Sequence, residues 1–228
     1  LCSGPANCVS SQRGFLVDVG MNWQIKNNQY VGEIESFQFC SQAGELEKGV
    51  NVTFQGKPLV QAFPLLMEKL TVNQDQSFVR GKDLVGSFSL SENVFECYWR
   101  LMKFGDSGCG LDAIFSLRSN RQTTGSIDLK SLLHPFADKS NSMPGFPHYH
   151  DPQLNCYALL VVHPVDLDAV ELHQEDKSLA IGIQLNEMER GVIRRIRMRM
   201  QVGVGELSDS QIEEFGSRFS ESDLPLTT

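Results

Sequence analysis

The sequence predicts a single, mostly antiparallel β domain, a sandwich or a distorted barrel, closed by one C-terminal helix. Apolar and polar residues alternate with period two in segment after segment from Phe15 to Val202, which is typical of half-buried strands. The one convincing helical spacing follows those segments, and no composition shift marks a linker. We therefore divide the chain into a flexible lead-in, residues 1–14, and one domain, residues 15–228.

Composition limits the classes of function. A chain of 228 residues with 41% hydrophobic and 21% charged residues can bury a sizeable core. Its net charge of −8 argues against nucleic acid as a partner, and no run approaches the roughly 20 apolar residues of a membrane span. We expect a soluble, cytoplasmic protein with reduced cysteines; secretion stays open, because the chain begins at Leu1 and a removed targeting segment would not be visible.

The clearest alternation opens the domain. Apolar residues at every second position from Phe15 to Ile25 predict one long strand, and Asn27 and Asn28 supply turn chemistry for an antiparallel return over residues 30–40. Further strands are expected at 50–54, 84–90, 94–103, 111–118 and 156–162. The expected core comprises Phe15, Val17, Val19, Met21, Trp23, Trp99, Leu160, Ile181, Ile183, Ile196 and Met198.

Prolines mark the irregular segments. Pro58 and Pro64 predict that residues 57–70 form an extended connection or an edge strand, because proline cannot donate to a sheet ladder. Residues 134–155 contain four prolines and are expected to form the longest loop, and long loops in compact domains are often functional.

The last strands and the helix are expected to be neighbours. Residues 179–185 alternate, and a short connection leads to the alternating segment 193–202, so we predict a hairpin with Ala180, Gly182 and Gln184 beside the second strand's polar face. Ser208 and Gln211 have the spacing of a capping box that opens a helix over about 209–219. Ile212, Phe215 and Phe219 then form its buried stripe.

Three arginines form the first candidate site. Arg195, Arg197 and Arg199 alternate with apolar residues, so a strand would place them in a row on one face. Guanidinium groups bind phosphate, sulfate or carboxylate bidentately, which makes the row a candidate anion site. The alternative is a solvated or ion-paired face, for which Asp166, Asp168, Glu171, Glu175 and Asp176 are the available acids.

Two histidines form the second candidate site. His148 and His150 would point the same way from an extended segment, and with Asp151 they suit a transition metal such as zinc, iron or copper. Pro144 and Gly145 followed by the two histidines resemble the metal motif of cupin barrels, which implies a metal-dependent enzyme. The glutamate of that motif is missing, since Leu154 and Asn155 occupy its positions; the alternative is a surface loop with incidental histidines.

A third group lies on the polar face of a predicted strand. The only candidate on a sheet face for binding a carbohydrate is the group Glu96, Tyr98 and Arg100, because Trp23 and Trp99 fall on apolar faces. The alternative is a mixed polar surface. No nucleophile elbow, phosphate-binding glycine loop or dinucleotide fingerprint is present, and nothing nearby designates a base for Cys109.

These observations favour a non-enzymatic module that binds a ligand or assembles through one sheet face. Its partner would be an anionic small molecule or an acidic protein surface, with no cofactor expected. Two alternatives stay open: a cupin-like enzyme using a transition metal, and a structural subunit of a homo-oligomer in which the arginines meet acids of a second copy.

Overall fold

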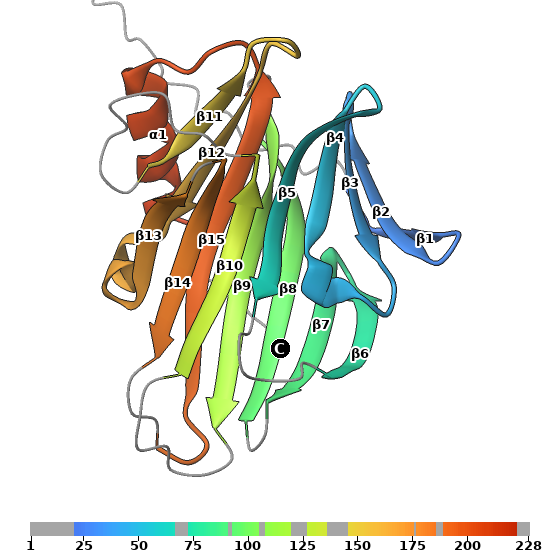
Figure 1. Ribbon diagram of the computed structural model, residues 1–228, viewed down its shortest axis with the longest axis vertical. Helices are drawn as coiled ribbons and strands as arrows, with labels where there is room; N and C mark the ends of the chain where they lie inside the picture. The colour runs from blue at the N-terminus through green and yellow to red at the C-terminus, as the bar shows by residue number, and fades with distance from the viewer. Residues whose placement is uncertain are drawn as a thin grey trace, which may run out of the picture.

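The computed structural model describes residues 21–66, 73–90, 93–104, 108–119, 127–135, 146–175, 177–185 and 189–222. Within them, two antiparallel sheets face each other and one α-helix follows the last strand (Figure 1). The elements are β1 (Gln24–Lys26), β2 (Gln29–Ile34), β3 (Phe37–Gln42), η1 (Leu46–Lys48), β4 (Val50–Phe54), β5 (Lys57–Leu66), β6 (Asn73–Arg80), β7 (Asp83–Leu90), β8 (Asn93–Lys103), β9 (Cys109–Ser119), β10 (Ile127–His134), β11 (His148–Asp151), β12 (Cys156–Val162), η2 (Pro164–Ala169), β13 (Val170–Glu175), β14 (Ser178–Leu185), β15 (Ile193–Val204) and α1 (Asp209–Ser220).

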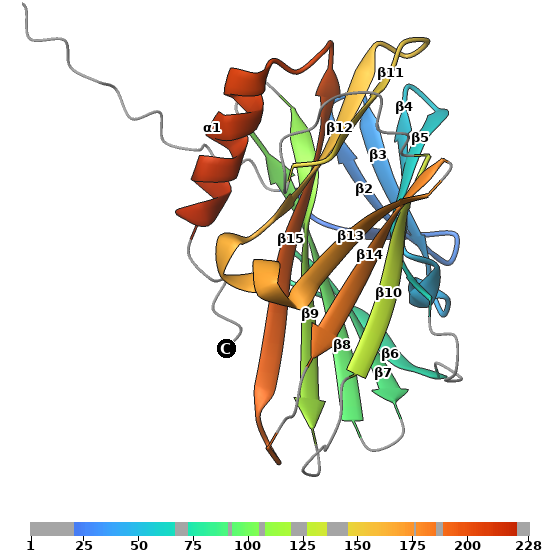
Figure 2. The same cartoon turned by 60° about the vertical axis from the view of Figure 1, so that its left-hand side comes forward.

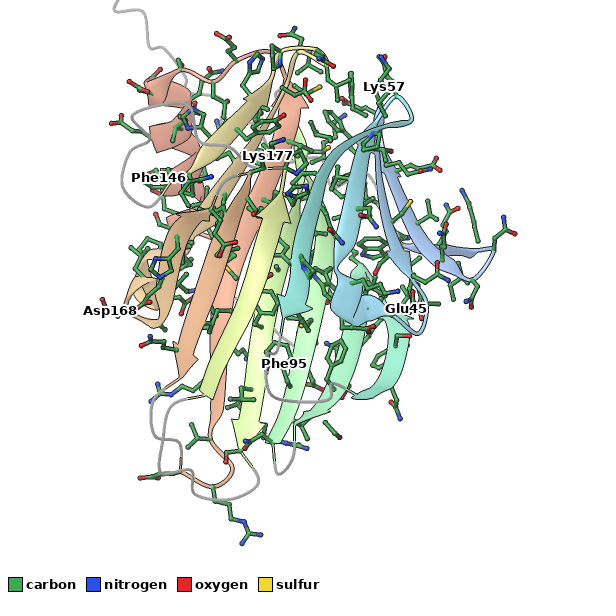
Figure 3. All side chains as sticks on the ribbon, in the orientation of Figure 1. Glu45, Lys57, Phe95, Phe146, Asp168 and Lys177 are labelled. Atoms are coloured by element: carbon green, nitrogen blue, oxygen red, sulfur yellow. The ribbon has the colours of Figure 1, made fainter. Side chains whose placement is uncertain are left out.

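The architecture is a sandwich. The eight-stranded sheet runs β1-β2-β3-β4-β5-β10-β14-β13, and the seven-stranded sheet runs β11-β12-β15-β9-β8-β7-β6. Because the sheets remain separate, the sandwich form of the prediction is confirmed and the barrel form is not. The main core fills the space between them, where Phe95 stacks on Phe115 with ring centroids 5.9 Å apart (Figure 3).

Most of the expected core is buried. All seven of the expected residues from Trp23 onward are at most 4% exposed, and Met21 is half-buried against the same cluster. Phe15, Val17 and Val19 lie outside the described residues, as does the whole lead-in. The buried members are Trp23, Trp99, Leu160, Ile181, Ile183, Ile196 and Met198.

The predicted asparagine turn is confirmed. Asn27 and Asn28 have φ angles of 49° and 62°, and they join β1 to β2 in an antiparallel hairpin. Two successive positive φ angles match the twist of the flanking strands, and asparagine adopts them more readily than most residues. The expected single return strand over residues 30–40 is divided in two: β2 returns along β1, and the chain then reverses again so that β3 pairs antiparallel with β2.

The proline-containing strand β5 is internal, so the prediction of a connection or edge is wrong. It pairs with β4 on one side and with β10 on the other. Both prolines lie where the ladder is irregular: the register shifts next to Pro58, and it shifts again between Ala62 and Leu65, which flank Pro64. A bulge removes the need for an N–H donor at these positions, so the strand tolerates both prolines.

The predicted hairpin of the last two strands is also wrong. β14 pairs with β10 and β13 in the eight-stranded sheet, whereas β15 pairs with β9 and β12 in the other sheet. Ala180, Gly182 and Gln184 therefore do not lie beside the arginines. Period-two alternation determines which face a residue occupies, but it contains no information about the neighbouring strand.

The C-terminal helix is confirmed, and it covers the outer face of the seven-stranded sheet. The Ser208 N–H donates to Gln211 Oε1 over 3.0 Å, the reciprocal bond that a capping box provides. Ile212, Phe215 and Phe219 pack on Tyr157, Leu159 and Val161 of β12. Figure 2 shows α1 beside β12 and β15, away from β10 and β14. In the described part of the chain, no helix is long and apolar enough to cross a membrane.

Candidate functional site

The three arginines lie on the outer face of β15, as the alternation predicts. Ile196, Met198 and Met200 enter the core between the sheets. Arg195 is exposed, but the side chains of Arg197 and Arg199 are only 10% and 7% exposed. The row is therefore a partly covered surface rather than a solvated one, since η2 approaches Arg197 and α1 approaches Arg199.

Arg199 is held in a fixed position by a carboxylate and two aromatic rings. Its Nε and Nη2 donate to the two oxygens of Asp112 over 2.5 and 2.8 Å. The guanidinium carbon lies 4.8 Å from the ring centroid of Phe104 and 4.4 Å from that of Phe219. The bidentate ion pair and the two ring contacts hold the guanidinium in place, so Arg199 links the sheet to α1 and has a structural role.

Arg197 has a different environment, built where β12 ends. Beyond Val162 the strand pairing is completed by η2: the His163 N–H donates to the Arg197 carbonyl, and the Arg197 N–H donates to Asp166 Oδ2 over 3.0 Å. The same Oδ2 lies 3.5 Å from Arg197 Nε. Arg197 Nη2 is 2.8 Å from His163 Nδ1, and Nη1 has no hydrogen-bond partner among the described residues.

A cavity of about 270 Å³ opens beside this arginine. Arg195 and Arg197 supply two positive charges to its wall and Asp166 supplies one negative charge, so the lining is cationic in a protein with a net charge of −8. Val165 and Ile193 complete the lining, and they are 72% and 48% exposed. A smaller cavity of about 100 Å³, lined in part by Arg197, Arg199 and Phe219, lies between the sheet and the end of α1.

The acids suggested by the sequence are distributed over the molecule. Asp166 contacts Arg197, but Asp168 lies at the outer rim of η2 and points away from the sandwich (Figure 3). Glu171 and Glu175 are on β13 in the other sheet, and Asp176 lies outside the described residues. Asp112, the partner of Arg199, was not among the predicted acids, because it is 87 residues away in the sequence and only the strand register brings the pair together.

Asp112 also belongs to a row of alternating charge that crosses the seven-stranded sheet. In register from β6 to β15, Arg80, Asp83, Arg100, Asp112 and Arg199 occupy successive strands. Arg100 Nε and Nη2 donate to the two oxygens of Asp83 over 2.7 and 2.9 Å. Opposite charges on facing positions stabilise strand pairing, so the row has a structural explanation.

The group offered for carbohydrate lies on this same face. Tyr98 is only 8% exposed, and its hydroxyl donates to Glu96 Oε2 over 2.6 Å. The Arg80 guanidinium carbon lies 5.4 Å from the centroid of the Tyr98 ring. Burial, together with Glu96, raises the pKa of Tyr98 to about 12. With Arg100 bound to Asp83, the group forms a packed polar cluster without an exposed aromatic platform.

The two histidines are on β11, an edge strand, and not in an irregular loop. His148 faces Leu159 and His150 faces Tyr157 across the strand pair, so both histidines are on the α1 side of the sheet. Asp151 alternates to the other side, where its Oδ1 accepts the N–H groups of the two residues that form the following turn. Among the described residues, no three His, Cys, Asp or Glu side chains gather as a metal site.

The described cysteines are free thiols. Cys97 and Cys109 are buried, and burial raises the pKa of both thiols, which disfavours the thiolate that a nucleophile requires. Cys40 and Cys156 are likewise unpaired, with pKa values that burial raises. Cys2 and Cys8 lie outside the described residues.

Comparison with known proteins establishes the fold alone. No protein-family model matches the chain, and no curated protein matches it in sequence. A solved structure described as a kojibiose phosphorylase from the human microbiome aligns with 90% of this chain at a TM-score of 0.55 and 9% identity. A mutant of the heparan sulfate lyase HepC from Pedobacter heparinus aligns with 82% at 0.53 and 7% identity.

Both similar structures are larger than this chain, which spans 37% of the length of each. Both are described as enzymes that act on carbohydrates. At such low identity the similarity supports a shared sandwich fold, and unrelated functions commonly occur on one fold.

Proposed function

We propose that this protein is a ligand-binding module that binds an oxyanion in the cavity beside Arg197, with Arg195 and Arg197 as the binding residues. The observation that carries the proposal is the Arg197 guanidinium, which Asp166 and His163 hold on one side while Nη1 has no partner in the described part of the chain. A preorganised guanidinium with an unused donor is suited to a sulfate, phosphate or carboxylate oxygen.

The second arginine supports the same chemistry. Arg195 is two residues from Arg197 on one strand face, a separation of about 7 Å that two guanidinium groups can bridge around one anion. Arg199 is excluded from this role, because Asp112 and two aromatic rings already occupy it. The anion site therefore comprises two arginines rather than the three in the sequence row.

The cavity also indicates the size of the ligand. Its volume of about 270 Å³ lies just below the roughly 300 Å³ at which small-molecule sites begin. The Asp166 carboxylate can accept a hydrogen bond from a ligand hydroxyl, and Val165 and Ile193 offer apolar contact. An acidic sugar combines these features, and the fold shared with enzymes that act on carbohydrates is consistent with that ligand class.

Stabilisation against urea by sulfate tests the proposal. At a concentration 100 times its Kd, a ligand that binds only the native state adds about 2.7 kcal/mol to the free energy of unfolding. We expect a sulfate series to exceed a chloride series of equal ionic strength. Arg197→Gln should abolish the excess, whereas the control Arg194→Gln, an exposed position on the same strand outside the cavity lining, should retain it.

Two further arms define the ligand. A sulfated disaccharide should stabilise the protein at lower concentration than inorganic sulfate does, while the matching neutral disaccharide should have no effect. If wild type and Arg197→Gln respond equally to sulfate, the proposal is wrong. If the sulfated and the neutral disaccharide stabilise the protein equally, the assignment of an acidic sugar is wrong. The anion site itself then stands only if inorganic sulfate is bound.

A further inference from the structure

We propose that His163 positions Arg197 and couples anion binding at the site to the uptake of one proton. The inference rests on the proposed function, because it concerns the same guanidinium. His163 does not line the anion cavity, but its ring contacts the guanidinium that does. It is therefore a positioning residue rather than a ligand of the anion.

The hydrogen bond determines which form of His163 supports Arg197. Nη2 of Arg197 lies 2.8 Å from Nδ1, and a guanidinium can only donate, so Nδ1 must be the unprotonated acceptor. The Val165 N–H approaches the same nitrogen at 3.4 Å. His163 is 5% exposed, and its ring packs edge-to-face with Phe219, with ring centroids 5.4 Å apart. The neutral ring is thus fixed from three elements: β15, η2 and α1.

The charged groups around His163 oppose its protonation in the unliganded protein. Burial lowers its pKa most, and Arg197 and Arg199 on β15 lower it further. Asp166 on η2 and the Ser220 carbonyl at the end of α1 act in the opposite direction. The balance keeps the ring neutral close to neutral pH, with Nδ1 available to Arg197.

An anion on Arg197 reverses that balance. Protonation of His163 removes the acceptor for Nη2 and places a second positive charge beside the guanidinium. A bound oxyanion supplies both the missing acceptor and a compensating negative charge. Because coupling between two binding events is reciprocal, the anion should bind more tightly as the pH falls, and the bound anion should raise the pKa of His163.

Calorimetric titration with sulfate provides the test, because sulfate remains a dianion throughout the range. We expect the Kd to be at least about fivefold lower at about pH 5.5 than at about pH 7.5 at constant ionic strength. His163→Asn keeps an acceptor oxygen but cannot take up a proton, so it should bind sulfate with little pH dependence. His173→Asn, at a histidine whose side chain is 66% exposed on the other sheet, should retain the full dependence.

A second readout needs no variant. In NMR spectra of the wild-type protein, the ring protons of His163 should titrate at a higher pH in saturating sulfate than in chloride. Sulfate binding with the same pH dependence in His163→Asn, or an unchanged His163 titration, would overturn this inference and leave the anion site standing. Failure of the wild-type protein to bind sulfate at either pH would overturn both.

Discussion

Replacing Arg199 should reveal a buried ion pair that joins the sheet to its covering helix. The arginine and Asp112 side chains are only 7% and 17% exposed, so removing one partner leaves a poorly solvated charge. Removing one member of a buried pair typically costs about 3–5 kcal/mol. Methionine can fill the space between Phe104 and Phe219 without the charge. We therefore expect Arg199→Met to lower the free energy of unfolding by about 3 kcal/mol.

A double variant separates the cost of the uncompensated charge from the cost of lost packing. Asp112→Asn removes the carboxylate charge, so Arg199→Met combined with Asp112→Asn should be less destabilised than the sum of the single variants. The expected coupling is about 1–3 kcal/mol, within the range for residues in direct contact. Equilibrium unfolding in urea measures the free energy of unfolding of the wild type, the two single variants and the double variant. The m-values of the four proteins should be equal.

An exposed pair provides the control. Arg218 and Glu214 on α1 are four residues apart, with side chains 59% and 53% exposed. Arg218→Met should change the free energy of unfolding by no more than about 0.5 kcal/mol. The reasoning fails if Arg199→Met costs no more than this control, or if the effects of Arg199→Met and Asp112→Asn simply add.

Three further unfolding measurements test other parts of the structure. Gly49→Ala should cost more than about 2 kcal/mol, because Gly49 has a φ of 76° and an added Cβ would lie 2.3 Å from the Ala62 carbonyl oxygen; a near-neutral effect would contradict this geometry. Ser208→Ala should cost about 1 kcal/mol through the start of α1, and a loss below about 0.3 would mean that the cap contributes little. The folded pKa of His163 is lowered, so below its ordinary value of 6.5 the unfolded chain binds more protons. Wild-type stability should therefore fall as the pH decreases through that value and down to the folded pKa; His163→Asn should flatten this part of the profile, and an unchanged slope would refute the assignment.

The sequence predicted which face of a strand each side chain occupies better than it predicted which strands pair with each other. Alternation correctly placed Ile196 and Met198 in the core and the arginines on the opposite face of one strand. It could not show that β15 pairs with β9 and β12, and this error produced the incorrect hairpin with β14. Side-chain direction depends on the local backbone, whereas pairing depends on how distant strands pack, which a single sequence does not encode in any periodic form.

The candidate site was predictable only in part. The row of arginines and the nearby Asp166 were visible in the sequence, but the separation of Arg199, held by Asp112, from the two arginines that line the cavity was not. That separation depends on Asp112 of β9, on Phe104 just after β8, and on Phe219 of α1. His163 gave no signal, since a histidine before a proline has no recognisable pattern until η2 brings its ring against Arg197.

The position of a bound anion tests the central claim most directly. Selenate has the charge and shape of sulfate, and its selenium atom can be located by anomalous scattering in a crystal. We predict one ordered selenate in the cavity lined by Val165, Asp166, Ile193, Arg195 and Arg197, within hydrogen-bonding distance of Arg197 Nη1. Selenate bound only at other positions, with this cavity holding solvent alone at a saturating concentration, would contradict the account.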